Sequence, residues 1–192
     1  MEFIDNIKHI TSEIERINSK VDAEDNEKVI NLITKTKRIF IFGAGRSGLV
    51  GKAFAMRLVH LGKEVYFVGS ATTPAIFQDD CLIVISGSGT TSSVARVAES
   101  AQKQGAVIVA ITIHPNSLIG EMANFVIQIK AEREEDDISD YLSRQLTHKN
   151  LTPMGTLFEL SALIYFDSII PILMERLDVS EGYMKNRHAN LE

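Results

Sequence analysis

The architecture expected of this 192-residue chain follows from one run, Arg38-Ile39-Phe40-Ile41-Phe42-Gly43-Ala44-Gly45-Arg46-Ser47-Gly48. Its apolar first half is typical of a buried strand. Its second half is rich in glycine and leads into a helix expected over about 47–61. A strand, a glycine turn and a helix in this order are the opening unit of an α/β domain.

The same alternation repeats along the chain. Further strands are expected over 65–68, 82–85, 106–113 and 125–129, and helices over 91–104 and 116–122. A long apolar helix is expected from about 154 to 177, and helices over 2–19 and 24–36 precede the first strand. Strands that alternate with helices predict a parallel sheet covered on both faces. Ligands of such sheets bind at the carboxyl ends of the strands, near the point where the strand order reverses.

Composition narrows the class of protein. The chain is 45% hydrophobic and 23% charged, which fits one globular domain with a real core. A formal net charge of -5 gives no indication of a nucleic-acid partner. The start of the chain is acidic and amphipathic, unlike a signal peptide, and we see no apolar run near the roughly 20 residues that cross a bilayer. We therefore expect a cytoplasmic protein with no membrane partner, and we expect its single cysteine, Cys81, to be buried in an apolar strand.

The glycine turn matches G-x-G-x-x-G, a pattern that lets the backbone approach a phosphate. A dinucleotide site also needs an acidic residue roughly 20 residues later. The second strand instead ends in Gly69-Ser70-Ala71-Thr72, without a carboxylate or an arginine, so we predict no nucleotide cofactor. Gly45, Arg46 and Ser47 are candidate ligand contacts, because an arginine offers a rigid fork of donors to an anion. The alternatives are a turn without a ligand and an arginine that pairs with an acidic loop.

A second turn follows the third strand and consists of hydroxyl residues and glycines: Ser86, Gly87, Ser88, Gly89, Thr90 and Thr91. Hydroxyl groups and backbone N–H groups at the start of a helix suit a phosphate monoester without a metal. The lysine of a nucleoside-triphosphate loop is absent. The alternative is a helix cap with spare serines, which one hydroxyl would satisfy.

Two side chains are candidates for acid–base chemistry. Glu159 lies at the start of the long apolar helix, although Thr156 and Glu159 also have the spacing of a capping box. His188 lies in the tail sequence Arg187-His188-Ala189-Asn190, where disorder is the usual alternative. We expect His60, at the end of an amphipathic helix, to be structural. Metal-ligand spacing is absent, so we predict no required metal.

An acidic stretch over 131–150 interrupts the alternation. We expect an exposed loop with a helical turn around 138–146, and a lid over the site is the alternative.

The chain resembles the sugar isomerase (SIS) domain family, and within it the 6-phospho-3-hexuloisomerase branch. The turn Ser86–Thr91 is general to the family. The features typical of the branch are the Gly-x-Gly-Arg-Ser-Gly turn at 43–48, the Met154-Gly155-Thr156 segment and the Arg187-His188 tail. The segment Phe54–Gly62 adds to this likeness, which covers nearly the whole length. The stretch 131–150 is longer than the short connection expected in this branch.

The resemblance implies a three-layer α/β sandwich, flavodoxin-like, with a five-stranded parallel sheet flanked by helices. One SIS domain would span 1–192, with N-terminal helices over 1–36, a core over 37–178 and a tail over 179–192. The family also implies a homo-oligomer, usually a tetramer.

The implied activity interconverts D-arabino-hex-3-ulose 6-phosphate and fructose 6-phosphate through an enediol. The resemblance assigns the phosphate to the Ser86–Thr91 turn and substrate contacts to Thr156 and the glycine turn. It makes Glu159 the enediol base and brings His188 to its own or a neighbour's active site. Isomerases of arabinose 5-phosphate or heptose 7-phosphate, and a sugar-phosphate-binding regulator without catalysis, are the alternatives.

Overall fold

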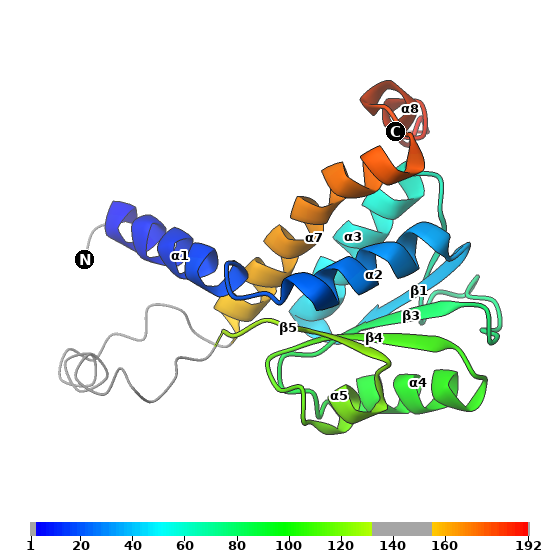
Figure 1. The fold of residues 1–192 in the computed structure, drawn as a ribbon, viewed down its shortest axis with the longest axis horizontal. Coiled ribbons are helices and arrows are strands. Elements are labelled where there is room, and N and C mark those ends of the chain that lie inside the picture. Colours follow the sequence, from blue (N-terminus) through cyan, green and yellow to red (C-terminus); the bar gives the residue numbers. More distant parts are fainter. Residues whose placement is uncertain (1–2, 132–154, 192) are drawn as a thin grey trace.

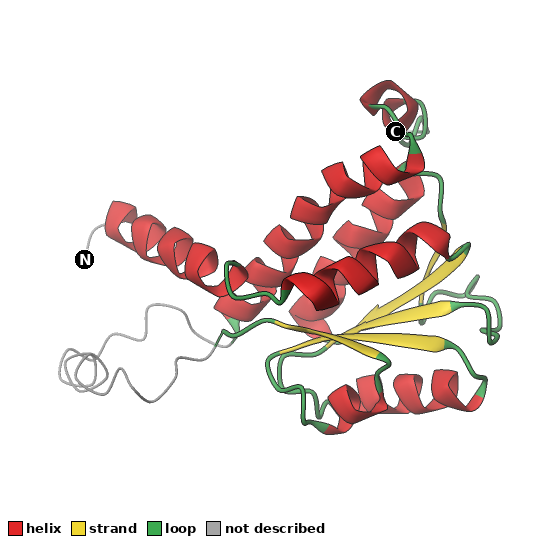
Figure 2. Cartoon of the chain, viewed as in Figure 1, coloured by secondary structure: helices red, strands yellow, loops and turns green. Residues whose placement is uncertain are grey.

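A computed structural model of the chain describes residues 3–131 and 155–191. Its sheet has five parallel strands in the order β2-β1-β3-β4-β5. The strands are β1 (Arg38–Gly43), β2 (Glu64–Phe67), β3 (Cys81–Ile85), β4 (Val107–Thr112) and β5 (Phe125–Gln128). The predicted parallel sheet is confirmed (Figure 2).

Helices cover both faces of this sheet. Those in the described residues are α1 (Phe3–Asn18), α2 (Ala23–Lys35), α3 (Gly45–His60), α4 (Ser92–Lys103), α5 (Leu118–Met122), α7 (Thr156–Leu177) and α8 (Glu181–Lys185). In Figure 1, α2, α3 and α7 lie over one face and α4 and α5 over the other. The result is the expected three-layer sandwich with N-terminal helices.

Successive strand residues point to opposite faces of the sheet, which divides the core in two. Ile39 and Ile41 of β1 pack with the cluster that includes α3 and α7, whereas Phe40 between them packs with the cluster that includes α4. Both faces of the central strands are buried, as their continuous apolar sequences predict. Phe54 of α3 stacks on Phe166 of α7 with ring centroids 4.0 Å apart, which locks these two helices together.

The expected bounds hold to within about two residues, with one consequence for the site. The third helix begins at Gly45, two residues earlier than expected, so Arg46 and Ser47 belong to its first turn. The helical turn expected at 138–146 lies outside the described residues.

The helix α7 corrects the expectation that no apolar segment approaches the length of a bilayer. By length and composition alone it is long enough to cross a membrane, and half of its most apolar window is buried inside the fold. Phe158, Phe166 and Leu173 are among its buried residues, and the helix packs on α1, α2 and α3. This burial is what a central helix of a sandwich requires.

Candidate active site

The two turns singled out in the sequence lie next to each other at the carboxyl edge of the sheet. The last residues of β1 and β3, Gly43 and Ile85, are direct partners in the parallel register. The chain crosses from β1 to β2 on one side and from β3 to β4 on the other, so the strand order reverses between them. A crevice at this point is where sheets of this type bind ligands.

The glycine turn after β1 is tightly packed. A Cβ on Gly48 would lie 2.5 Å from the carbonyl oxygen of Gly43, and one on Gly43 would lie 2.9 Å from the carbonyl carbon of Ser47. These two positions must be glycine because β1 and α3 approach each other too closely for a side chain. Gly45 has a φ of 57°, a left-handed conformation that the turn requires and that favours glycine. The turn places Arg46 at the edge of the sheet, where its Nε donates a hydrogen bond to Oε2 of Glu159. The arginine pairs with this buried carboxylate, whereas the acidic loop offered as its alternative partner lies almost wholly outside the described residues.

The turn after β3 holds its hydroxyl groups in a network. The hydroxyls of Ser86 and Thr91 lie 3.1 Å apart, and the Ser88 hydroxyl accepts a hydrogen bond from the backbone N–H of Thr90 at 3.3 Å. Thr91 is the N-cap of α4, yet its side chain makes no capping hydrogen bond. The alternative of a simple helix cap is therefore not what forms. A helix start whose amides are not capped by Thr91, surrounded by hydroxyls, suits an oxyanion.

Backbone contacts fix this turn to the neighbouring strand. The carbonyl of Gly87 accepts hydrogen bonds from the N–H of Ile113 at 3.1 Å and from the Thr112 hydroxyl at 3.2 Å. Gly89 adopts a φ of 64°, and a Cβ there would lie 1.8 Å from Oγ of Ser117. Ser117 caps α5 and lies in the loop after β4, so sequence analysis did not connect it with the site. Ser117 lies close to Gly89 because β3 and β4, the strands that precede these two residues, are neighbours in the sheet.

Glu159 enters the site from the first turn of α7. The N-cap of α7 is Gly155, in the left-handed conformation, and the N–H of Glu159 donates to the Gly155 carbonyl at 3.0 Å. Thr156 is therefore the first helical residue and Glu159 the fourth. The capping-box alternative needs the N-cap and the third helical residue, so it is wrong for this pair. Glu159 is 9% exposed and its carboxylate faces Arg46.

The hydroxyl turn and Glu159 are connected by direct packing. A Cβ built on Gly87 would lie 3.2 Å from Cδ1 of Phe158, the residue before Glu159. The chain thus brings together three predicted parts at one edge: the glycine turn with Arg46, the hydroxyl turn, and the start of α7 with Thr156 and Glu159. This arrangement can bind an anion beside a carboxylate that is paired with a guanidinium.

His188 is not part of this cluster within one chain. Its ring lies against His60, with ring centroids 5.3 Å apart. His60 is the last residue of α3 and Arg46 lies in its first turn, so roughly 21 Å of helix separates them. Sequence analysis took His60 as structural and missed this contact, because the two histidines are far apart in the sequence.

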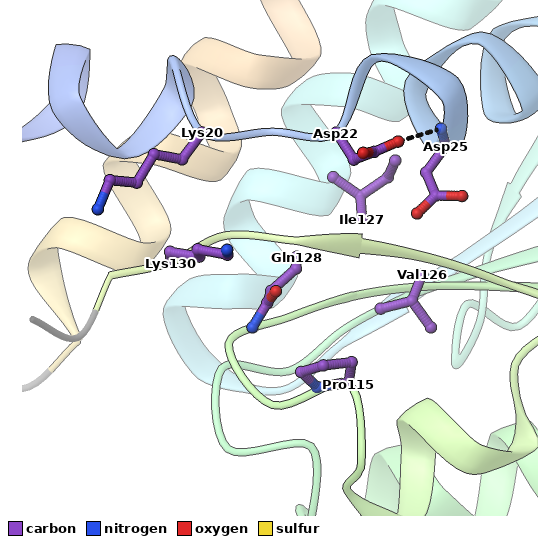
Figure 3. A pocket seen from close by; sticks show the side chains of 8 residues that line it. All are labelled: Lys20, Asp22, Asp25, Pro115, Val126, Ile127, Gln128 and Lys130. Carbon is purple, nitrogen blue, oxygen red and sulfur yellow. Dashed lines mark hydrogen bonds between the residues drawn. The ribbon is translucent and has the colours of Figure 1, made fainter. Parts of the chain in front are cut away.

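A separate cavity of about 270 Å³ lies beside the edge strand β5 (Figure 3). Its polar lining consists of Lys20, Asp22, Asp25, Gln128 and Lys130. Asp22 uses one carboxylate oxygen to cap α2, accepting from two backbone N–H groups at 2.9 Å. None of the residues predicted for the site lines this cavity.

Within residues 3–131 and 155–191, no three His, Cys, Asp or Glu side chains gather as a metal ion would require.

Comparisons with known proteins agree with the fold. A family model described as the SIS domain matches residues 32–163. The 3-hexulose-6-phosphate isomerase of Methanocaldococcus jannaschii is 44% identical over 165 residues, covering 86% of this chain and 83% of the relative. The enzyme of the same name from Mycobacterium gastri is 39% identical over 187 residues, covering 97% of this chain and 90% of the relative. A crystal structure of a Methanococcus jannaschii protein, from which the function of 3-hexulose-6-phosphate isomerase was inferred, matches with a TM-score of 0.79, 38% identity and coverage of 100% of both chains.

Proposed function

Since the chain belongs to the sugar isomerase (SIS) domain family, we propose that it is an isomerase that interconverts D-arabino-hex-3-ulose 6-phosphate and fructose 6-phosphate. Relatives of that name cover most of its length at 34–44% identity. The observation that carries the proposal is the pairing of Glu159 with Arg46 beside the hydroxyl turn. An isomerase of this kind needs one carboxylate beside one anion cradle, and the proposal is supported by Glu159 next to Arg46 and by Phe158 next to Gly87 of the hydroxyl turn.

Binding begins at the 6-phosphate. The hydroxyls of Ser86, Ser88, Thr90 and Thr91, with the amide groups at the start of α4, supply the donors for its oxygens. A side chain at Gly87 would meet Phe158, and one at Gly89 would meet Ser117, so either would displace the turn. The two glycines therefore keep the turn in the position proposed to bind the phosphate. Gly45 and Ser47 belong to the turn that carries Arg46, and Thr156 to the turn that carries Glu159, so all three would contact the sugar hydroxyls.

The chemical step moves one proton between neighbouring carbons. Glu159 removes the proton from C2 of the 3-keto sugar, which gives a 2,3-enediol, and returns it to C3, while the carbonyl passes from C3 to C2. Arg46 would leave part of its contact with Glu159 and donate to the oxygen on which negative charge develops. General-base catalysis of this type contributes about 10²–10⁴-fold to a rate. The second proton, which moves between the two oxygens, needs another group.

His188 is the candidate for that second transfer, and it would act in a neighbouring chain's site. Its own Glu159 lies at the other end of α3, beyond the reach of one sugar phosphate. Exposed apolar side chains support self-association: Phe3 on α1 is 78% exposed, and Leu49 and Met56 on α3 are also exposed. We propose a homotetramer in the cytoplasm, each chain forming one SIS domain over residues 1–192.

The test is turnover with purified protein. Synthetic D-arabino-hex-3-ulose 6-phosphate is supplied, and fructose 6-phosphate is measured with a coupled assay. Arabinose 5-phosphate and heptose 7-phosphate are supplied in parallel, since a preference for either would replace the proposed substrate. Binding of fructose 6-phosphate without exchange of its carbon-bound protons with solvent deuterium would identify a regulator and contradict the proposal.

A further inference from the structure

The rings of His60 and His188 pack together at the carboxyl end of α3, tilted by 32° at a centroid separation of 5.3 Å. His60 is buried, whereas His188 lies in the exposed tail that follows α8. We propose that His60 is a positioning residue, which holds the imidazole of His188 in the orientation that the proposed reaction uses. This inference rests on the function proposed above and adds a residue to it.

The tail reaches His60 on a well-anchored path. Ser180 caps α8 by accepting from the N–H of Tyr183 at 3.1 Å, and Met184 is buried against the core. The Tyr183 hydroxyl lies over Gly62, where a Cβ would be 2.7 Å away. Figure 1 shows α8 and the C-terminus beside the end of α3. These contacts of α8 fix the backbone that precedes residue 188. The orientation of the His188 ring is set by the groups that contact the ring itself.

Backbone and ring contacts then set the His188 side chain. Its N–H donates to the Lys185 carbonyl at 3.2 Å, and its Nδ1 lies 3.2 Å from the Ala189 carbonyl oxygen. The guanidinium of Arg187 packs over the Tyr183 ring, 4.3 Å from its centroid. The His60 ring supplies the aromatic surface on which His188 rests. A ring held on such a surface loses fewer rotamers when substrate arrives, which is the benefit of prior orientation.

The electrostatic setting of His60 suits a supporting role. Burial, with smaller effects from His188 and Arg57, lowers the pKa of His60 below its ordinary value. Burial of His60 therefore favours the uncharged form of the ring that faces His188.

The experiment compares His60→Ala, His60→Phe and His188→Ala in the full-length protein. We expect His60→Ala to lower kcat about tenfold or more with little change in KM, since misplaced catalytic groups cost rate rather than binding. His60→Phe keeps an aromatic ring and should restore most of the rate. The double variant His60→Ala with His188→Ala should be no slower than His188→Ala alone. Lys103→Ala, an exposed residue in the last turn of α4 on the other face of the sheet, is the control and should leave the rate unchanged.

Two results would overturn the proposal. One is a folded His60→Ala protein with full kcat, as judged by circular dichroism and thermal unfolding. The other is a double variant whose loss equals the product of the single losses, because independent residues multiply their effects. An NMR measurement without substrate tests the contact between His60 and His188 independently of the proposed function. The His188 ring-proton resonance should shift in His60→Ala through loss of the neighbouring ring current, and an unchanged resonance would contradict the contact even if the wild type is active.

Discussion

The guanidinium of Arg46, in the first turn of α3, hydrogen bonds to the carboxylate of Glu159, in the first turn of α7. The two residues are 113 positions apart in the sequence and meet at the carboxyl edge of the sheet. Arg46 is more than half exposed while Glu159 is nearly buried, so substrate would reach the arginine first. The pair holds the carboxylate in place beside the guanidinium before any ligand arrives.

Replacement of Glu159 by Gln removes the proposed base while keeping its size. Turnover should fall by about 10²–10⁴-fold, the range of general-base catalysis, with fructose 6-phosphate still bound. The matched control is Asp167→Asn on the same helix, whose half-exposed carboxylate lies 3.3 Å from Arg57. Turnover of this control should match the wild type. Full activity in Glu159→Gln would remove Glu159 from the mechanism.

Replacement of Gly89 by Ala tests the shape of the hydroxyl turn. The new Cβ meets Ser117 and the φ of 64° disfavours any side chain, so the turn must move away from the phosphate position. We expect KM to rise at least about tenfold, as one lost charge-assisted contact would cause. Gly105→Ala is the control, because Gly105 also has a positive φ and lies beside Gln78. It should lower the thermal midpoint without changing KM, and equal KM values for both variants would contradict the assignment.

Replacement of Asp80 by Asn tests the anchor of the loop between β2 and β3. Nε of Arg38 donates to Oδ1 of Asp80 at 2.8 Å, and the Phe77 N–H donates to Oδ2 at 2.7 Å. The variant should lose about 3 kcal/mol of unfolding free energy at pH 7, as expected when a buried ion pair loses one partner. Glu99→Gln, which removes the carboxylate of the exposed pair with Lys103, should leave the urea midpoint unchanged.

The stability that the Arg38–Asp80 pair contributes should depend on pH. The hydrogen bond from Arg38 is the main cause that lowers the pKa of Asp80 from 3.8. A carboxyl with a lower pKa in the folded state adds stability above its unfolded pKa and loses it as the pH falls through the folded value. The difference in unfolding free energy between wild type and Asp80→Asn should therefore be complete at about pH 6–7, well above the ordinary pKa of a carboxyl group. It should shrink below about pH 4. Urea unfolding at several pH values measures it, and a constant difference down to pH 2 would contradict the assignment.

Cys81 should be inert in the native protein. It is fully buried in β3, and burial, with a smaller effect from Asp80, raises the pKa of its thiol to about 12. The thiolate is the reactive form, so a disulfide reagent at pH 8 should label Cys81 only in denaturant. Rapid labelling without denaturant would show that the strand opens locally.

The sequence predicted the sheet well because its strands are continuous apolar runs, and Cys81–Ile85 is buried at every position. It also placed both turns at one edge, since parallel strands share their direction. It could not predict the partners that the turns find. The pairing of Arg46 with Glu159, the approach of Gly89 to Ser117 and the contact of His60 with His188 join segments distant in the chain. The capping-box alternative at Thr156 does not form, because Gly155 takes the left-handed conformation as the N-cap and the helix starts one residue earlier.

The length of α3 has a consequence for the behaviour of this protein in dilute solution. One helix holds Arg46 in its first turn, and its last residue, His60, contacts His188. In the function proposed above, a lone chain would therefore carry one part of the site at each end of α3. The proposed reaction needs both parts, so it would be coupled to association, and the rate per chain would depend on protein concentration. Specific activity would rise steeply as the protein concentration passes through the dissociation constant of the oligomer. It would level off once all chains are associated.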